Sequence, residues 1–328
     1  MDSRARVEAA IAGRKTDHPP VGAWGHTYKE EWSPEQLASV TIERQRRYGW
    51  DFVKFQPRAT FFAEAFGNRY EPSGHRLKGP VILEAAVPDL ESWKGLKLVD
   101  RKPLAEQARA LGLVVKELGD RVPVLQTVFS PISVAGYLVG KDKRRVVREL
   151  RKHPEVVLPA LERIGEALMD FSRDSVAQGA AGLFYAISGY ATPDSMPVDV
   201  YESLLLPLDQ RIVDSFPEAA WFNVLHLCGS HINIDVARKL RVPVVSWSTA
   251  NQGNPSLEQG RKLTGRAVMG GVAQRTTMLR GTPEQVGGEV KAAIGATGGL
   301  GVLIAPGCSV PPRARDANLK AMAAAAAA

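Results

Sequence analysis

The sequence predicts a (β/α)₈ barrel, and three observations lead to this fold class. The chain has 328 residues, which is a usual length for one such barrel with insertions. Eight short apolar or β-branched runs alternate with stretches that carry helix signals. No Gly-x-Gly-x-x-Gly motif follows the first run, so an open doubly wound sheet is only the second choice. We therefore expect a single domain over residues 1–328.

Each predicted strand is short and ends at a glycine, a proline or a polar residue. The second run, for example, stops at Pro57, and the fourth is followed by Ser188 and Gly189. The eight runs are Pro20–Trp24, Asp51–Gln56, Val122–Val128, Gly182–Ile187, Trp221–Leu227, Val242–Trp247, Ala267–Val272 and Gly301–Ala305. In a barrel, the carboxyl ends of all eight strands meet on one rim.

The predicted helices begin and end at recognisable capping residues. Ser33 is a good N-cap, Pro34 suits the first helical position, and Gly49 is expected to end that helix. Thr282-Pro-Glu-Gln is a capping-box pattern that opens another helix. The remaining helices are expected at 104–118, at 144–178 with a break at Pro154, at 198–215, at 232–240, at 257–263 and from Ala317 onward.

Residues 58–103 form a long connection after the second predicted strand. The connection carries several turn signals and an aromatic patch of Phe61, Phe62, Phe66 and Tyr70. A connection of this length in a compact domain is usually functional, so we expect a lid or a binding loop. The alanine-rich tail, residues 323–328, is expected to fray as a helix and to carry no chemistry.

Composition excludes several classes of protein. Charged residues make up 23% and hydrophobic residues 45%, which is the balance of an ordinary soluble globular protein. The formal net charge is +7, but the basic residues are scattered apart from the run Lys141–Arg148, which we interpret as a solvated helix face. No apolar run reaches membrane-spanning length, and the polar start lacks the apolar core of a signal peptide. With only two cysteines, we expect a cytoplasmic protein that binds neither nucleic acid nor membranes.

The two cysteines and one histidine form the most informative pattern in the chain. His226 and Cys228 are two residues apart at the end of a predicted strand, so their side chains point to the same face. Cys308 follows the eighth predicted strand and reaches the same rim. One imidazole and two thiolates suit Zn²⁺ with one coordination position open, as in a catalytic zinc site. A disulfide between the two cysteines, or ordinary burial of all three side chains, are the alternatives.

Other polar or unusual residues at the predicted strand ends are candidates for the same site. They are His26, Gln56, Ser130, Ser188, Tyr190, Ser246, Ser248 and Gln274. The residues that we expect to bind substrate are His26, Gln56, Arg58, Ser188, Tyr190 and Ser248. Arg58 is a better candidate than Lys54 for holding a substrate anion, although a surface role is equally consistent with its position. His26 is equally consistent with a metal ligand, an acid–base group or a structural residue.

Two segments of the chain resemble a known family. They are His226–Gly229, with its His-x-Cys-Gly pattern, and Ala305–Pro312, with its Pro-Gly-Cys pattern, which continues to Asn318–Met322. On these segments the chain resembles the uroporphyrinogen decarboxylase superfamily over nearly its whole length. Within it, the chain is most similar to the zinc- and corrinoid-dependent methyltransferases. The resemblance implies a uroporphyrinogen decarboxylase-like TIM barrel, with His226, Cys228 and Cys308 as metal ligands and catalytic residues.

This resemblance implies a zinc-dependent methyltransferase that moves a methyl group between a corrinoid (methylcobalamin) protein and a small thiol or methylated substrate. Ser246–Ala250 lacks the carboxylate that many relatives carry near the metal, so water, the substrate thiol or His26 would complete the coordination. The decarboxylase branch fits less well, because no arginine follows the first predicted strand and Pro57 stands where that branch has an essential aspartate. A decarboxylase-like lyase acting on a tetrapyrrole and a non-catalytic corrinoid-binding subunit are the alternatives. A homodimer is a possible assembly.

Overall fold

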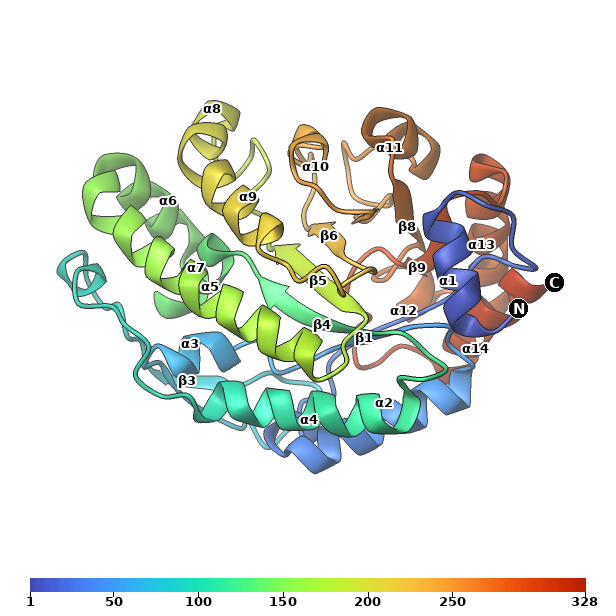
Figure 1. The fold of residues 1–328 in the computed structure, drawn as a ribbon, viewed down its shortest axis with the longest axis horizontal. Coiled ribbons are helices and arrows are strands. Elements are labelled where there is room, and N and C mark those ends of the chain that lie inside the picture. The colour runs from blue at the N-terminus through green and yellow to red at the C-terminus, as the bar shows by residue number, and fades with distance from the viewer.

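Seven parallel strands form the centre of the protein, which the computed structural model describes over residues 1–328. The strands are β1 (Val53–Phe55), β4 (Val124–Phe129), β5 (Gly182–Ile187), β6 (Val224–Leu227), β7 (Val244–Ser246), β8 (Ala267–Val272) and β9 (Val302–Pro306). They pair in the order β1-β4-β5-β6-β7-β8-β9, and helices surround the curled sheet (Figure 1). Nearly every strand residue is buried, as is usual for a parallel sheet that helices cover.

The segment Pro20–Trp24 closes the barrel between β9 and β1. Val21 forms a parallel bridge with Ile304 of β9, and on the other side the amide of Asp51 donates to the Val21 carbonyl at 2.7 Å. The Val21 amide is bonded to the Asp51 carboxylate at 2.9 Å, so a side chain replaces the backbone partner that would continue a ladder. The predicted barrel is therefore confirmed, but its first strand is reduced to this bridge.

Helices follow the strands in the expected order and cover the outside of the barrel (Figure 1). The longer ones are α1 (Ser3–Ile11), α2 (Pro34–Tyr48), α4 (Lys102–Leu118), α5 (Pro131–Leu138), α6 (Lys143–Lys152), α7 (Pro154–Ala177), α9 (Leu206–Asp214), α11 (Leu257–Thr264), α13 (Pro283–Thr297) and α14 (Asp316–Ala327). The short ones are α3 (Phe61–Ala65), α8 (Val198–Val200), α10 (Asp235–Lys239) and α12 (Thr277–Arg280).

The capping residues that predicted the helices act as expected. The Ser33 side chain accepts the Gln36 amide at the start of α2, and Gly49 ends the helix in the left-handed conformation with φ 64°. Both hydrogen bonds of the capping box are present at Thr282, before α13. The long helical region breaks at Pro154, where α6 gives way to α7.

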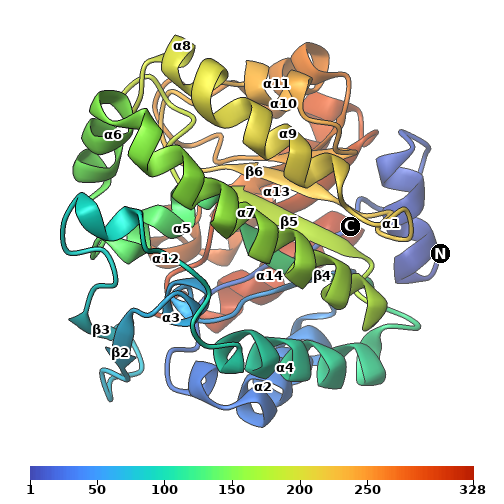
Figure 2. The same ribbon diagram turned by 60° about the vertical axis from the view of Figure 1, so that its left-hand side comes forward.

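The long connection 58–103 is partly structured. It contains α3 and a two-stranded antiparallel hairpin, β2 (Arg69–Glu71) with β3 (Val81–Glu84), which lies at the edge of the molecule (Figure 2). The aromatic patch does not face solvent, because Phe61, Phe62 and Phe66 are buried in the main core. That this connection acts as a lid stays a prediction.

One contiguous core of 79 buried residues draws on almost the whole chain, from Val7 to Ala326. The alanine tail takes part in it, since α14 continues to Ala327 and Ala326 is buried. The expectation of a frayed tail is therefore wrong: α14 packs along α13, and that contact stabilises the last turns. No helix of the structure combines the length and the apolar character needed to cross a bilayer.

Candidate active site

A cavity of about 340 Å³ opens at the carboxyl ends of the strands. The ends of β1, β4, β5 and β6, and the turn after β9, all contribute to its wall. The lining residues are Trp24, His26, Lys54, Gln56, Ala59, Phe129, Ser133, Gly136, Tyr137, Lys141, Lys143, Phe184, Ala186, Ser188, Tyr190, His226, Cys228, Cys308 and Ser309. This is the rim on which barrels of this class carry their active sites.

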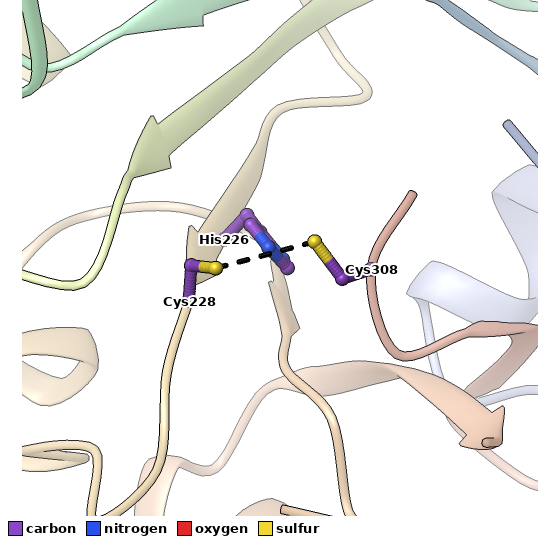
Figure 3. Close-up of side chains that lie close together, drawn as sticks. All are labelled: His226, Cys228 and Cys308. Atoms are coloured by element: carbon purple, nitrogen blue, oxygen red, sulfur yellow. Dashed lines mark hydrogen bonds between the residues drawn. The ribbon is translucent and has the colours of Figure 1, made fainter. Parts of the chain in front are cut away.

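His226, Cys228 and Cys308 converge on this wall (Figure 3). Their potential ligand atoms all lie within 4.8 Å of one another, and the two sulfur atoms are 4.0 Å apart. The His226 ring is buried, and its Nδ1 lies 3.2 Å from the Ser246 hydroxyl. Its other nitrogen, Nε2, is buried and has no hydrogen-bond partner in the protein. A buried polar atom without a partner is costly, so this nitrogen is set up to receive a ligand.

The spacing of the two sulfurs decides between a disulfide and a metal site. A disulfide requires about 2.05 Å between the sulfurs, and both cysteines are free. Two thiolates at about 2.3 Å from a tetrahedral zinc would be roughly 3.8 Å apart. The observed 4.0 Å agrees with that value. Together with the partnerless imidazole nitrogen, the donor set fits a zinc ion.

The two thiols differ in acidity because they are hydrogen-bonded to each other. The bond from Cys228, together with the neighbouring His226 ring and the Ser309 amide, holds the pKa of the Cys308 thiol well below its usual value. The same pair, together with burial, raises the pKa of Cys228. The site thus favours one thiolate without any metal, and a divalent cation would favour a second.

The local sequence explains how these side chains are held. His226 lies on β6 between Ala186 of β5 and Ser246 of β7, which places Ser246 beside its ring. Gly307 brings Cys308 into place, because a Cβ at position 307 would lie 2.4 Å from the Cα of Ser248. Only glycine allows the turn after β9 to come so near the turn after β7.

A second polar group on the same wall comes from β1 and the segment before it. The Lys54 ammonium lies 4.8 Å from the centre of the Phe184 ring and donates a hydrogen bond to Gln56 Oε1. Gln56 Nε2 is 3.4 Å from His26 Nε2, and His26 Nδ1 is 2.8 Å from Glu31 Oε1. Burial lowers the pKa of Lys54 to about 7, partly offset by the nearby charges of Cys308 and Glu31.

Four of the six residues predicted to bind substrate line the cavity: His26, Gln56, Ser188 and Tyr190. The Tyr190 hydroxyl is buried and has no partner, and the Ser188 carbonyl accepts a hydrogen bond from Lys143. His26 is not part of the His226, Cys228 and Cys308 group, since its ring is held by Glu31 and Gln56. A role in substrate binding stays a prediction for all four.

The other two residues lie away from the wall. Arg58 is buried against Glu64 and Glu106, with N–O distances of 2.8 and 3.0 Å, so its donors are used within the protein. Ser248 is buried and donates to Gln274 Oε1 at 3.1 Å. Neither residue is among those that line the cavity, and a role in substrate binding stays a prediction for both.

The sequence analysis undervalued Lys54, interpreted Lys141 and Lys143 as part of a solvated helix face, and assigned no role to Ser133 or Ser309. All five residues line the cavity. A signal for Lys54 was present. It stands two residues before Gln56 in the same strand, so both side chains point to the same side of the barrel. The residues in the turns gave no such signal, because their direction depends on how the chain turns after each strand.

The sequence and the fold are similar to those of known methyltransferases and of a uroporphyrinogen decarboxylase. The methylcobamide:CoM methyltransferase MtaA of Methanosarcina barkeri is 26% identical, over 98% of this chain and 96% of that protein. The chloroplastic uroporphyrinogen decarboxylase of Nicotiana tabacum is 28% identical, over 63% of this chain and 57% of that protein. A solved methyltransferase from Methanosarcina mazei has the same fold, with a TM-score of 0.83 and 23% identity over 99% of this chain and 98% of that one.

The family model for uroporphyrinogen decarboxylase (URO-D) matches residues 2–328, nearly the entire chain. The fold, the cavity on the expected rim and the similarity to methyltransferases over almost the full length all agree with that match. The predicted family is therefore confirmed. The chain belongs to the uroporphyrinogen decarboxylase family, as a methyltransferase-like enzyme of that family.

Proposed function

We propose that the protein is a zinc-dependent methyltransferase that moves a methyl group between a corrinoid protein and a small thiol or methylated substrate. The observation that carries this proposal is the convergence of two free thiols and a partnerless imidazole nitrogen on one cavity wall. Similarity over nearly the full length to methyltransferases named for methylcobamide supports it.

His226 Nε2, Cys228 Sγ and Cys308 Sγ would hold the zinc ion. When bound, zinc lowers the pKa of a coordinated thiol and holds the resulting thiolate in place as a nucleophile. The Ser246 hydroxyl fixes the orientation of the His226 ring and directs Nε2 toward the sulfurs. Phe184 stacks on the same ring at 5.2 Å and keeps water from that side of the site.

The size of the cavity indicates that the two substrates bind in different places. About 340 Å³ accommodates a small thiol, whereas a corrin ring carried by a protein must approach from the mouth. In the thiol direction, the substrate sulfur forms a bond to the methyl carbon while the cobalt–carbon bond breaks, and both electrons of that bond stay on cobalt. The thiol proton leaves to solvent or to a neighbouring base.

Decarboxylation of a tetrapyrrole has less support from the cavity. No arginine is among the residues that line it, and its wall is lined instead by lysines, aromatic rings and the two thiols. Several carboxylates on one large substrate would need several fixed cations in the site.

Zinc analysis of the purified protein tests the proposal. We expect about one zinc per chain in the wild type, and much less in Cys228→Ser and Cys308→Ser. We also expect the absorbance of methylcobalamin to change when the wild type, but neither variant, is mixed with a small thiol. A wild type without zinc, or variants with unchanged zinc content, would show the proposal to be wrong.

A further inference from the structure

A second and much smaller cavity lies between α2 and the strands at the start of the barrel. Its volume is about 30 Å³, which is room for one or two particles of the size of a water molecule. Twelve residues line it, and they come from the segment 23–27, from α2, and from β1 with the residues beside it. None of the three proposed metal ligands is among them, so this cavity is distinct from the active site.

The wall of the small cavity carries positive charge and no carboxylate. Arg44 and Lys54 are among the lining residues, whereas no aspartate or glutamate is. The partly buried guanidinium of Arg44 donates to the Gly25 carbonyl at 3.2 Å and forms no ion pair. Burial lowers the pKa of Arg44 from its usual value, which agrees with a cation that has lost part of its hydration. Arginine has five N–H donors, so most of those of Arg44 remain free.

Trp50 supplies a further donor without a partner. Its side chain is 4% exposed, and its indole Nε1 is buried and has no hydrogen-bond partner in the protein. The Arg44 guanidinium lies over the Trp50 ring, 5.6 Å from its centre, which brings the two groups together on one wall. An indole N–H can only donate, so an acceptor is what this wall lacks.

The Lys54 ammonium is directed to the other cavity. It lies 4.8 Å from the centre of the Phe184 ring, and Phe184 lines the active-site cavity but not the small one. It also donates a hydrogen bond to Gln56. The free donors of the small cavity are therefore those of Arg44 and Trp50.

An anion suits these donors better than a water molecule does. Water accepts hydrogen bonds, but it brings hydrogens that need acceptors of their own and no charge to balance the guanidinium. A halide ion accepts from several donors at once and supplies the negative charge. That charge has a large effect in a site that bulk water screens poorly. The volume admits an ion of this size and excludes phosphate and larger oxyanions.

We propose that the small cavity binds one inorganic anion of the size of chloride, held by the Arg44 guanidinium and the indole N–H of Trp50. The anion has a structural role. Arg44 belongs to α2 and is bonded to Gly25, while Trp50 lies just before β1, so one ion links the helix to the segment 23–27 and to the start of β1. This site is independent of the proposed function, because it uses neither the metal ligands nor the substrate cavity.

Titration with chloride, followed by the line width of the ³⁵Cl nuclear magnetic resonance signal, tests the site. Sodium gluconate, whose anion is too large for the cavity, keeps the ionic strength constant. The proteins are the wild type, Arg44→Met, Trp50→Phe and the control Arg46→Met, which removes an exposed arginine of the same helix that is paired with Glu117. We expect saturable broadening in the wild type and the control. Binding should be about 10- to 100-fold weaker in Arg44→Met and about tenfold weaker in Trp50→Phe.

Two further measurements make the test specific. Bromide should displace chloride and phosphate should not, and crystals soaked in bromide should show an anomalous peak between Arg44 and Trp50. Zinc content is measured for every protein, so that chloride bound to zinc is recognised as a contribution common to all of them. A wild type without saturable broadening, or an Arg44→Met variant that binds like the control, overturns the proposal. If Arg44→Met does not fold, Trp50→Phe decides, because it keeps the aromatic ring and removes only the N–H donor; unchanged binding in that variant also overturns the proposal.

Discussion

The wall of the cavity carries two groups of polar side chains with different chemistry. In one group, His226, Cys228 and Cys308 present soft donor atoms, and the imidazole nitrogen among them has no protein partner. On the same wall, Lys54 presents three N–H donors, and its one hydrogen-bond acceptor in the protein is the neutral amide of Gln56. The imidazole has a nitrogen without a partner, whereas the ammonium has N–H donors without acceptors. Buried polar groups are normally paired, so a buried group that is left without a partner marks a place where a ligand can bind.

Arg58 is a buried cation that, unlike Lys54, has carboxylate partners. It lies four residues after Lys54 and is equally buried, yet Glu64 and Glu106 satisfy its charge. The complete ion pair stabilises the long connection, whereas the incomplete group at Lys54 faces the cavity. Residue type and burial do not distinguish these two cations, but their partners do.

The largest expected effect comes from removing one of the three proposed metal ligands. Cys308→Ala should reduce zinc affinity well over 100-fold, because two ligands hold zinc much less tightly than three. Competition with a chromophoric chelator measures that affinity, and the variant Lys97→Met, in an exposed lysine, provides the control. An unchanged zinc affinity would remove Cys308 from the metal site and with it the contrast between the two groups.

The next effect concerns the paired cation. Arg58→Met should lower the free energy of unfolding by about 3–5 kcal/mol, because it leaves the Glu64 and Glu106 carboxylates without their counter-ion. Urea denaturation measures this change, and Lys97→Met serves as the surface control. An Arg58→Met variant with unchanged stability would show that these two ion pairs do not stabilise the fold.

Lys54→Met should change stability in the opposite direction. Because the folded protein buries an unpaired cation, its replacement by methionine should stabilise the protein by about 1–4 kcal/mol at pH 7. The pKa of Lys54 is lowered from 10.5 to about 7, so the folded state binds fewer protons than the unfolded state between these values. Wild-type stability should therefore rise with pH in that window, and the advantage of the variant should shrink.

Urea denaturation of both proteins at pH 7, 8 and 9 measures this convergence. A wild type that is more stable than Lys54→Met at pH 7 would contradict the absence of a counter-ion. A constant difference across the three pH values would contradict the lowered pKa.

The smallest effect concerns the partner of the imidazole. Ser246→Ala removes the hydroxyl beside His226 Nδ1 but none of the three proposed ligands. We expect roughly tenfold weaker zinc binding, since a partner of this kind only orients the ligand. The chelator competition used for Cys308→Ala measures it. A loss as large as that of Cys308→Ala would mean that Ser246 itself contacts the metal.

Much of the fold could be predicted because it depends on local signals. The caps at Ser33 and Thr282 and the break at Pro154 act within one or two turns of helix, and they are found where the sequence placed them. The predicted secondary structure was wrong at two places where contacts with segments distant in the sequence determine the local structure. The segment Pro20–Trp24 became a bridge because the Asp51 side chain takes its amide, and the alanine tail is ordered because α13 packs beside it.

By itself, the sequence determined the barrel and the group of His226, Cys228 and Cys308 in the site. Two cysteines and a histidine form a rare pattern, and the alternation of strands and helices is enough to bring them to one rim. Only the tertiary structure decided the group around Lys54. Lysine, glutamine, histidine and glutamate are common everywhere on a protein surface, so their presence predicts little. Whether Lys54 or Arg58 lacks a counter-ion depends on Glu64 and Glu106, whose positions are set by packing rather than by spacing along the chain.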